Sequence, residues 1–415
     1  MSDITAKASR KMKKYAVLTR EPRCFLGSFD FSWEQRKAID IADYSKGNGY
    51  SKGDLTDAGT PIILYGRLYT KYQFAISEVD TFAVPRNGAV YSQGNEVIVP
   101  ASGETAEDIA RASAVEKSGV LLGGDLNILR PFDFINPLFL ALAISNGEPQ
   151  KELAKKAQGK SVVHIHNTDI QEVTIAYPSR TEQDRIVSVF RQLDNLITLH
   201  QRKCVFLFSF FRACISMNFT ASTFSWEQRK LSEMCGTFEY GLNASAKEFD
   251  GKNKYIRITD IDDANREFLL SDLSSPAICL DGMSKYLLSS GDIVFARTGA
   301  SVGKTYIYRE NDGIVYFAGF LIRAKVNQDN DAEFVFQSTL SPSYEKYIRI
   351  TSQRSGQPGV NAQEYGEYDL FAPSKEEQQR IGHFLRGIDN LITLHQRELE
   401  KLQNIKKSML EKMFV

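Results

Sequence analysis

One glycine-rich segment has residue types that could bind phosphate. It reads Gly299-Ala-Ser-Val-Gly303-Lys304-Thr305, and in a P-loop the backbone N–H groups between two glycines surround the phosphates while the Lys and the hydroxyl residue complete the site. A P-loop needs four residues between its glycines, whereas this segment has three. We therefore expect no nucleoside triphosphatase, and we expect this turn and Lys304 to contact a phosphate group of another kind.

Two further sets of residues could bind metal or form disulfides. His164 and His166 would lie on one face of a strand, but no Cys or carboxylate cluster with ligand spacing accompanies them. The five cysteines are odd in number, scattered and without CxxC spacing, which argues against a disulfide framework and a zinc site. We expect no metal and reduced thiols at Cys24, Cys204, Cys214, Cys235 and Cys279.

Basic, aromatic and hydroxyl residues occur together in several predicted loops. Arg and Lys neutralise phosphates, and Arg and Ser also bind base edges, so this mixture favours DNA. The 51 basic residues are balanced by 51 acidic ones, so the basic residues that bind must be concentrated locally. For any single residue, a solvated charged surface is an equally good interpretation. The candidates are Tyr65, Arg67, Tyr69, Lys71, Lys155, Lys156, Lys160, Arg257, Arg297, Thr298, Ser301, Lys304, Arg349 and Arg354.

The length and composition limit which elements can position these residues. A chain of 415 residues with 42% hydrophobic and 25% charged residues predicts two or three globular domains. The best candidate for a membrane span, Val205 to Met217, is shorter than the ~20 residues required and contains Ser209 and Arg212. The apolar run near the N-terminus is too short for a secretory signal. We expect a cytoplasmic protein.

The chain contains an internal duplication. Phe31-Ser-Trp-Glu-Gln-Arg-Lys37 recurs unchanged at 224–230, and Asp194-Asn-Leu-Ile-Thr-Leu-His-Gln-Arg202 recurs unchanged at 389–397. Repeats of solenoid proteins have periods of roughly 20 to 50 residues, so this much longer period indicates a duplicated domain with its connector. Between the identical segments the two copies diverge, as expected if one architecture serves two different ligands.

The divergent segments contain short runs typical of β-strands. Gly, Asn and Asp turns separate these runs from one another and from some helical stretches, which predicts a compact mixed α/β domain in each copy. The clearest runs are Pro61–Tyr65, Glu96–Val99, Tyr255–Thr259 and Asp292–Ala296.

The segments after Pro178-Ser179 and Pro373-Ser374 predict two long helices. Steps of four and three residues reach mostly apolar positions over ~35 residues, or ~50 Å, which favours a coiled-coil seam in which the two helices pair. The alternative is an ordinary amphipathic helix that packs on a globular core. The first seam contains Ile186, Phe190, Leu193, Ile197, His200, Cys204, Leu207, Phe211 and Cys214. The second contains Ile381, Leu385, Ile388, Ile392, His395, Leu399, Leu402, Lys406, Met409 and Met413.

The two histidines occupy equivalent positions in the seams. A polar residue at such a position more often fixes the register of two helices than it binds metal or catalyses a reaction. We therefore assign His200 and His395 to the helix pairing and give them no catalytic role.

Three duplicated motifs together resemble one protein family over nearly the whole chain. They are Trp-Glu-Gln-Arg-Lys at the start of each half, Glu-Gln-x-Arg-Ile at Glu182–Ile186 and Glu377–Ile381, and the nine-residue segment that contains His200 and His395. The sequence resembles the specificity subunits of type I restriction-modification systems.

The resemblance implies a fold and a set of partners. In that family two target-recognition domains each bind one half of a split double-stranded DNA site, and two antiparallel helices hold the domains at a fixed distance. Two methylation subunits and two restriction subunits join the complex and carry the catalytic sites, so S-adenosylmethionine, ATP and Mg²⁺ are expected on those partners. We therefore expect two α/β target-recognition domains and two coiled-coil helices, with an arm at 1–30, the domains at 31–177 and 224–372, and the helices at 178–223 and 373–415.

Two other classes of function compete with this interpretation. A fused methyltransferase or nuclease would need a methylation motif of the Asn-Pro-Pro-Tyr type, a methyl-donor fingerprint or a Walker motif. The nearest approach, Asn136-Pro-Leu-Phe, lacks the second proline. A coiled-coil scaffold that binds only protein is the second alternative. We expect no catalytic residue in this chain.

Overall fold

Two compact units make up the chain, and each contains part of both long helices. The computed structural model describes residues 33–157, 159, 162–220, 226–263 and 265–414. Unit 1 comprises the described residues up to Ile197 and those from Glu400 onward, and unit 2 comprises Thr198 to Leu399. The predicted arm, Cys24 and the candidate Lys160 lie outside the described residues.

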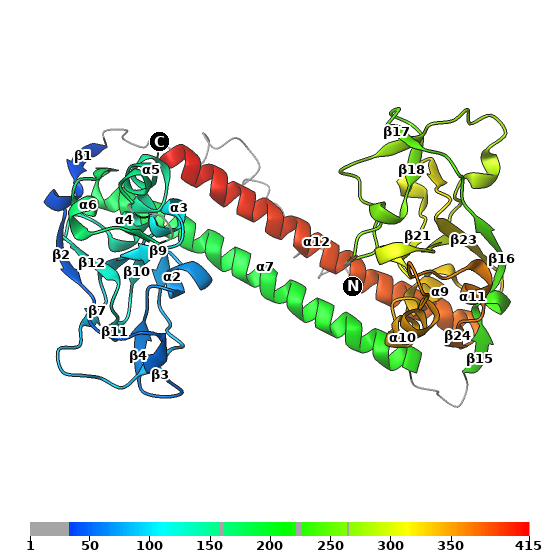
Figure 1. Ribbon diagram of the computed structural model, residues 1–415, viewed down its shortest axis with the longest axis horizontal. Coiled ribbons are helices and arrows are strands. Elements are labelled where there is room, and N and C mark those ends of the chain that lie inside the picture. The colour runs from blue at the N-terminus through cyan, green and yellow to red at the C-terminus, as the bar shows by residue number, and fades with distance from the viewer. Residues whose placement is uncertain (1–32, 158, 160–161, 221–225, 264, 415) are drawn as a thin grey trace, which may run out of the picture. The chain divides into compact units, whose positions relative to one another are not determined.

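Unit 1 is built on two five-stranded sheets (Figure 1). The first has the order β2-β12-β8-β10-β5 and is antiparallel except for the pair β10–β5, and the second has the order β3-β6-β4-β11-β7. These strands are β2 (Ala42–Lys46), β3 (Leu55–Thr56), β4 (Thr60–Ile63), β5 (Ala75–Ile76), β6 (Phe82–Ala83), β7 (Tyr91–Gln93), β8 (Glu96–Pro100), β10 (Ser113–Val115), β11 (Ser118–Leu122) and β12 (Leu126–Pro131).

Short strand pairs and short helices complete the described part of unit 1. The helix α4 packs against β8 and β10, and its six buried residues explain why its sequence is apolar on all sides. The paired strands are β1 (Glu34–Lys37) with β14 (Thr174–Tyr177), and β9 (Ser102–Gly103) with β13 (Val163–His164). The helices are α2 (Arg67–Thr70), α3 (Ala106–Ile109), α4 (Pro137–Ile144), α5 (Gly147–Lys156) and α6 (Asn167–Gln171).

Unit 2 is built on one four-stranded antiparallel sheet of order β16-β23-β20-β21 (Figure 1). The helix α9 packs against β20 and β21. The strands are β15 (Glu227–Lys230), β16 (Cys235–Tyr240), β17 (Ala246–Glu248), β18 (Lys254–Ile256), β19 (Ser274–Pro276), β20 (Asp292–Ala296), β21 (Thr305–Ile307), β22 (Val315–Phe317), β23 (Leu321–Val326) and β24 (Asp369–Ala372). The short helices are α8 (Leu231–Met234), α9 (Ala332–Ser338), α10 (Pro342–Thr351) and α11 (Ala362–Gly366).

The two units share a framework and differ in what is added to it. The order β2-β12-β8-β10 in unit 1 corresponds to β16-β23-β20-β21 in unit 2, and one helix packs on the last two strands in each case. Unit 1 adds a second five-stranded sheet, whereas unit 2 adds the two-stranded sheets β17–β19 and β18–β22. The expectation of a duplicated mixed α/β architecture is therefore confirmed.

Two long helices contribute to both units. The helix α7 (Arg180–Thr220) has 41 residues and α12 (Lys375–Met413) has 39, or about 60 Å each at 1.5 Å per residue. In unit 2, His200 faces His395 while Phe211 lies in one core with Leu385, so the two helices run antiparallel there. Within the described residues no helix is both long and apolar enough to cross a membrane.

The predicted seam positions are buried, but they face more than the other helix. Ile186, Phe190 and Leu193 share one core with Phe139 of α4, and Ile388 and its neighbours share another with Phe334 of α9. The helices therefore pair with each other and also pack on the sheet domains. Both interpretations of their apolar pattern, the coiled-coil seam and the amphipathic helix on a globular core, apply in part. The fully or mostly buried seam residues are Ile186, Phe190, Leu193, Phe211, Leu385, Ile388 and Ile392. Ile197, His200, Ile381 and His395 are partly buried.

Candidate nucleic-acid interface

A buried glutamine at the start of each long helix holds the domain framework in place. Gln183 accepts a hydrogen bond from the backbone N–H of Asn136 (2.7 Å) and donates to the carbonyl oxygens of Phe134 (3.1 Å) and Pro178 (2.9 Å). Gln378 in unit 2 accepts from the N–H of Asp331 (3.0 Å) and donates to the carbonyl of Pro373 (2.9 Å). The duplicated Glu-Gln-x-Arg-Ile motif thus performs the same structural task twice.

The duplicated Trp-Glu-Gln-Arg-Lys segments close each domain. Glu34–Lys37 and Glu227–Lys230 form edge strands that pair with the last strand before each long helix. The preceding tryptophan packs edge-on against a phenylalanine of the buried helix, with ring centroids 5.9 Å apart for Trp33–Phe139 and 6.1 Å apart for Trp226–Phe334. These identical segments therefore contribute the same framework contacts to both domains.

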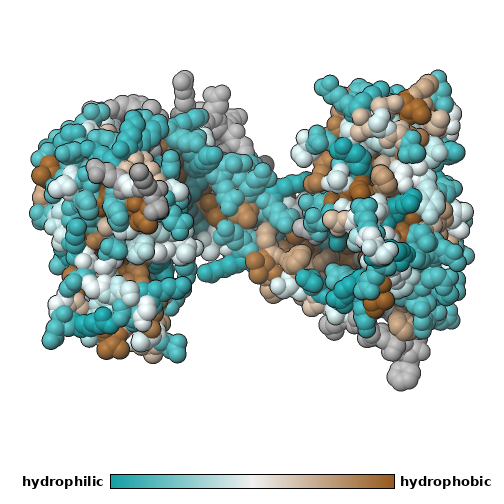
Figure 2. All heavy atoms as spheres, viewed as in Figure 1, coloured by the Kyte–Doolittle hydropathy of each residue, from teal (hydrophilic) through white to brown (hydrophobic). Residues whose placement is uncertain are grey.

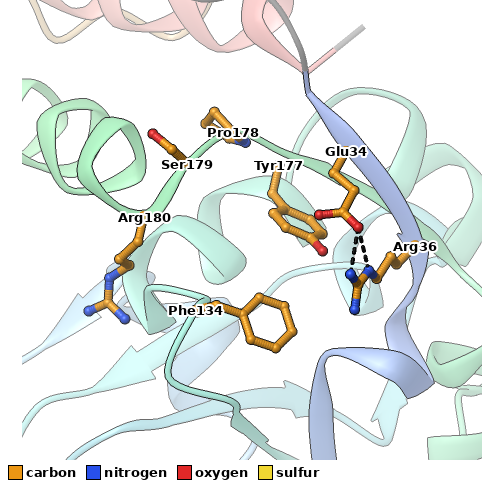
Figure 3. A pocket seen from close by; sticks show the side chains of 7 residues that line it. All are labelled: Glu34, Arg36, Phe134, Tyr177, Pro178, Ser179 and Arg180. Atoms are coloured by element: carbon orange, nitrogen blue, oxygen red, sulfur yellow. Dashed lines mark hydrogen bonds and ion pairs between the residues drawn. The ribbon is translucent and has the colours of Figure 1, made fainter.

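A pocket of about 400 Å³ lies beside the closing strands of unit 1. Glu34 and Arg36 of β1, Tyr177 of β14 and Phe134 surround it, and Arg180 lies at its other side (Figure 3). Arg36 Nε donates to Glu34 Oε1 (2.7 Å), and its guanidinium carbon lies 5.5 Å from the centre of the Phe134 ring. The Arg36 hydrogen bond holds the pKa of the Glu34 carboxyl below its usual value.

The charged groups of this pocket are already paired. Arg180 donates to Asp184 Oδ1 (3.1 Å) and to the carbonyl of Asp133 (2.5 Å), and Arg36 is held by Glu34. The described lining contains no histidine, no cysteine and no pair of carboxylates that general acid–base chemistry could use. We assign this pocket to the closure of the framework.

The first group of predicted DNA contacts lies on and around α2. Arg67 is almost buried and pairs with Asp80 (2.5 Å), and Lys71 pairs with the other oxygen of the same carboxylate (2.6 Å). These hydrogen bonds, first from Lys71 and then from Arg67, lower the pKa of Asp80. Tyr69 donates to the carbonyl of Ser102 (2.6 Å), and burial raises its pKa, whereas Tyr65 is exposed and meets Tyr69 edge-on.

The second group in unit 1 lies at the end of α5. Lys156 pairs with Glu172, and this hydrogen bond raises the pKa of the Lys156 ammonium. Lys155 is exposed and has no hydrogen bond or ion pair within the described part of the chain. Of the two described lysines in this group, Lys155 is therefore the one that is available to a ligand.

Most cationic candidates in unit 2 are also paired with carboxylates. Arg257 binds Asp260 through two nitrogens (2.8 and 2.9 Å), Lys304 binds Asp263 (2.6 Å) and Arg354 binds Glu364. Lys304 is mostly buried, with 13% of its side chain exposed. Its expected contact with a phosphate would require the Asp263 pair to break, and it stays a prediction.

Two cationic candidates of unit 2 have no carboxylate partner among the described residues. Arg349 is exposed on α10. Arg297 lies with its guanidinium carbon 5.1 Å from the centre of the Tyr240 ring. Thr298 donates to the carbonyl of Pro358 (3.4 Å), and Ser301 is partly exposed in the turn that follows.

Equivalent loops in the two units carry a hydroxyl residue followed by glycine. In unit 1, Ser102-Gly103 pairs with β13, and Ser102 Oγ lies 3.1 Å from His164 Nδ1. In unit 2, Thr298-Gly299 leaves β20 in the same way and Thr298 forms a bridge with Gly359. His164 therefore lies at the position that corresponds to Gly359. The expectation that His164 and His166 share one face of a strand is wrong, because β13 ends at His164 and His166 is the N-cap of α6.

Sequence reasoning missed the residues that hold these loops. Neither Tyr240, whose ring lies beside the Arg297 guanidinium, nor Phe320, whose carbonyl accepts from the Arg297 N–H, carries a local signal of this role, because each contact joins residues that are separated in the sequence. The duplication did mark Gln183 and Gln378, since both stand in a repeated motif. Among the described residues no group of three or more His, Cys, Asp or Glu side chains is placed to hold a metal ion.

Comparisons with known proteins agree on one family. A sequence profile of the type I restriction modification DNA specificity domain matches residues 32–204 and 225–404. The type I restriction enzyme MjaVIII specificity subunit of Methanocaldococcus jannaschii is 22% identical over 347 residues, which cover 78% of this chain and 79% of that protein.

Solved structures show the same fold. The S subunit of a type I restriction-modification system from M. genitalium has a TM-score of 0.64 at 17% identity and covers 94% of this chain and 97% of its own. A chain from a structure concerned with assembly of a type I R-M system has a TM-score of 0.51 at 13% identity, with 94% and 99% coverage. Because the family profile spans both copies of the duplication, this chain belongs to the family of type I restriction-modification specificity subunits.

Proposed function

We propose that each unit binds one half of a bipartite double-stranded DNA sequence and that the two long helices set the gap between the halves. The observation that carries this proposal is that equivalent framework contacts, such as those of Gln183 and Gln378, support two domains with different added sheets. If both units bound the same half-site sequence, their added sheets would not need to differ. Two domains that each supply a few base contacts gain affinity when they are linked, because the second contact is intramolecular.

The distribution of unpaired cations supports DNA as the ligand. Lys155, Arg349 and Arg297 have no carboxylate partner among the described residues, and His164 is exposed beside a hydroxyl. Phosphate contacts supply affinity, whereas side chains that reach base edges supply sequence selectivity. Lys155 and His164 belong to unit 1 and Arg297 and Arg349 to unit 2, so each unit by itself offers such groups, which suits a sequence-selective DNA-binding protein with balanced net charge.

An exposed apolar stripe on the helix pair of unit 2 supports the recruitment of protein partners. Large apolar side chains interrupt a largely hydrophilic surface (Figure 2). On α7, Phe206 (67% exposed) stacks on Phe210 with ring planes 7° apart. Large apolar side chains that lie together on an exposed surface, as Phe206 and Phe210 do, mark interaction sites in proteins that assemble. The stripe contains Leu199, Phe206 and Phe210 of α7 and Phe384, Leu391 and Leu394 of α12.

We propose that this stripe binds a methylation subunit and that restriction subunits join through the methylation subunits. Two methylation and two restriction subunits would match the duplication of the chain. In this proposal the chain has no catalytic site, and S-adenosylmethionine, ATP and Mg²⁺ bind the partner subunits in the cytoplasm.

The proposal is tested by mapping the DNA that the complex methylates. The chain is expressed with its methylation subunit in a host that lacks adenine methylation, and methylated adenines are located genome-wide by single-molecule sequencing. The expected result is a two-part motif with an undefined gap of constant length.

Other outcomes of this experiment distinguish the alternatives. Methylation by the purified chain alone would establish a fused methyltransferase. A folded complex with the methylation subunit that neither methylates nor binds a defined sequence would favour the protein-binding scaffold. Either result would overturn the proposed function.

A further inference from the structure

The guanidinium of Arg297 is fixed in place without using its hydrogen-bond donors. Arg297 follows β20, its guanidinium carbon lies 5.1 Å from the centre of the Tyr240 ring, and no carboxylate or carbonyl accepts from its side chain within the described residues. A guanidinium stacked on an aromatic face keeps its planar array of N–H donors available at the edge. Arg297 therefore presents unused donors to the solvent.

The Tyr240 ring that supports Arg297 is itself anchored. Tyr240 ends β16, and its hydroxyl accepts a hydrogen bond from the backbone N–H of Ala362 at the start of α11 (3.3 Å). The strand β16 and the helix α11 are in contact at this edge of unit 2 (Figure 1). The ring is therefore held from both ends, which fixes the plane on which the guanidinium rests.

The backbone of Arg297 is fixed as strongly as its side chain. Its N–H donates to the carbonyl of Phe320 (3.0 Å), and its carbonyl accepts from the N–H of Val360 (2.9 Å). The side chain of Phe320, whose carbonyl accepts this hydrogen bond, is 59% exposed and adds an apolar surface there. A guanidinium held on a rigid support loses little conformational entropy when it binds. This suits a side chain that must hydrogen-bond to acceptors in one fixed arrangement.

The other arginine candidates lack this combination of features. Arg67, Arg257 and Arg354 donate to Asp80, Asp260 and Glu364, so binding a base would require breaking an ion pair. Arg349 is exposed on a helix without a described support, which suits a phosphate contact that needs charge but no fixed geometry.

We propose that Arg297 reads a guanine in the half-site bound by unit 2, and that Tyr240 is its positioning residue. Two guanidinium N–H groups match the O6 and N7 acceptors of guanine in the major groove, which no other base offers as a pair of acceptors. This inference rests on the proposed function, since it names the base that one unit of the bipartite reader selects.

The corresponding loop of unit 1 predicts that the two half-sites are read by different chemistry. Ala101 occupies the position before Ser102 that Arg297 occupies before Thr298, and it is nearly buried. Unit 1 therefore has no arginine at this point of the framework. Changes at Arg297 alter one half of the motif and leave the other half unchanged.

The test compares methylation motifs of complexes that carry substitutions in unit 2. Arg297→Lys keeps the positive charge but cannot donate to O6 and N7 in the planar bidentate arrangement. We expect methylation to continue while one guanine of one half-site becomes degenerate, with discrimination against other bases falling roughly 10- to 100-fold. Tyr240→Ala relaxes the same position, and Tyr240→Phe, which keeps the ring but loses the hydrogen bond from Ala362, relaxes it less than Tyr240→Ala does.

Arg349→Lys is the matched control, because it makes the same substitution at an exposed arginine, and it leaves every motif position unchanged. An unchanged motif for Arg297→Lys and Arg297→Ala would overturn the inference while leaving the proposed function intact. Equal loss of methylation at all sites with Arg297→Ala, fully restored by Arg297→Lys with the original motif, would also overturn it, since charge alone would then suffice. Absence of any bipartite motif with the unsubstituted chain would instead overturn the proposed function.

Discussion

Nδ1 of His200 and Nδ1 of His395 lie 3.2 Å apart in the helix pair of unit 2, with the two rings edge to face. A hydrogen bond between these atoms requires one protonated and one unprotonated nitrogen, so two imidazolium rings cannot form it. Burial, then Lys203 and then His200 lower the pKa of His395. Lys203 on α7 and Glu398 on α12 are the charged groups that act on this ring.

We expect acid to weaken this helix pair. Since the pKa of His395 is lower in the folded chain, the unfolded chain binds more protons just below its ordinary value of about 6.5, and stability falls as the pH drops through that range. Thermal unfolding at pH 7.5 and 5.5 measures the effect. His395→Gln should reduce the difference in Tm between the two pH values, and an equal difference in both proteins would contradict the role of the pair.

Asp389 shows the opposite dependence on pH. Burial raises its pKa to about 7, and its carboxylate accepts a hydrogen bond from Gln337 Nε2 (2.9 Å). The folded chain therefore favours the protonated carboxyl, and the stabilisation this gives is lost as the pH rises from about 4 to about 7. Asp389→Asn keeps an acceptor for Gln337 and removes the ionisation, so it should stabilise the protein at pH 8 more than at pH 5.

The repeat supplies a control for that prediction. Asp194 has the same sequence context as Asp389 but pairs with Lys406 of α12 in unit 1 (2.5 Å), with 34% of its side chain exposed. Asp194→Asn should destabilise the chain by no more than about 1 kcal/mol, because the ion pair is partly exposed. Urea unfolding of both variants at pH 5 and pH 8 measures whether each substitution stabilises or destabilises the chain. A stabilising effect of Asp194→Asn would contradict this account.

Removing either buried glutamine should destabilise its unit strongly. Gln183→Ala leaves the N–H of Asn136 and the carbonyls of Phe134 and Pro178 without their partner, at a cost of roughly 2–4 kcal/mol for several buried groups. Gln378→Ala should act similarly in unit 2. The exposed neighbour Gln379 is the control, since Gln379→Ala should change the free energy of unfolding by less than about 0.5 kcal/mol. Equal effects at Gln378 and Gln379 would refute the framework role.

The sequence predicted the framework well because its signals are local or duplicated. The apolar period along Ile186, Phe190 and Leu193 identifies a helix from its own residues, and the repeated glutamine motif points to a shared task. The ion pair of Arg67 with Asp80 was not predictable, because nothing in the sequence around Asp80 distinguishes it from other acidic residues. The support of Arg297 by Tyr240 likewise exists only through tertiary contact.

A polar substitution in the exposed stripe should weaken assembly without weakening the fold. Phe206 and Val205 are both 67% exposed, but they lie about 100° apart around α7, so only Phe206 belongs to the stripe. Phe206→Ser should reduce the affinity for the methylation subunit roughly tenfold or more while leaving Tm almost unchanged. Val205→Ser is the control, and sedimentation of the mixed subunits measures both. Equal losses for the two variants would argue against the stripe.

Lengthening both helices should lengthen the gap in the DNA motif. Four residues inserted after Leu199 and four after the equivalent Leu394 add about 6 Å to each helix and about one turn, which roughly preserves the seam. If the helices set the distance between half-sites, the gap grows by about two base pairs at 3.4 Å each, while both half-sites keep their sequences. The methylation motif of the lengthened complex measures this directly. An unchanged gap in an active complex would mean that some other element fixes the spacing.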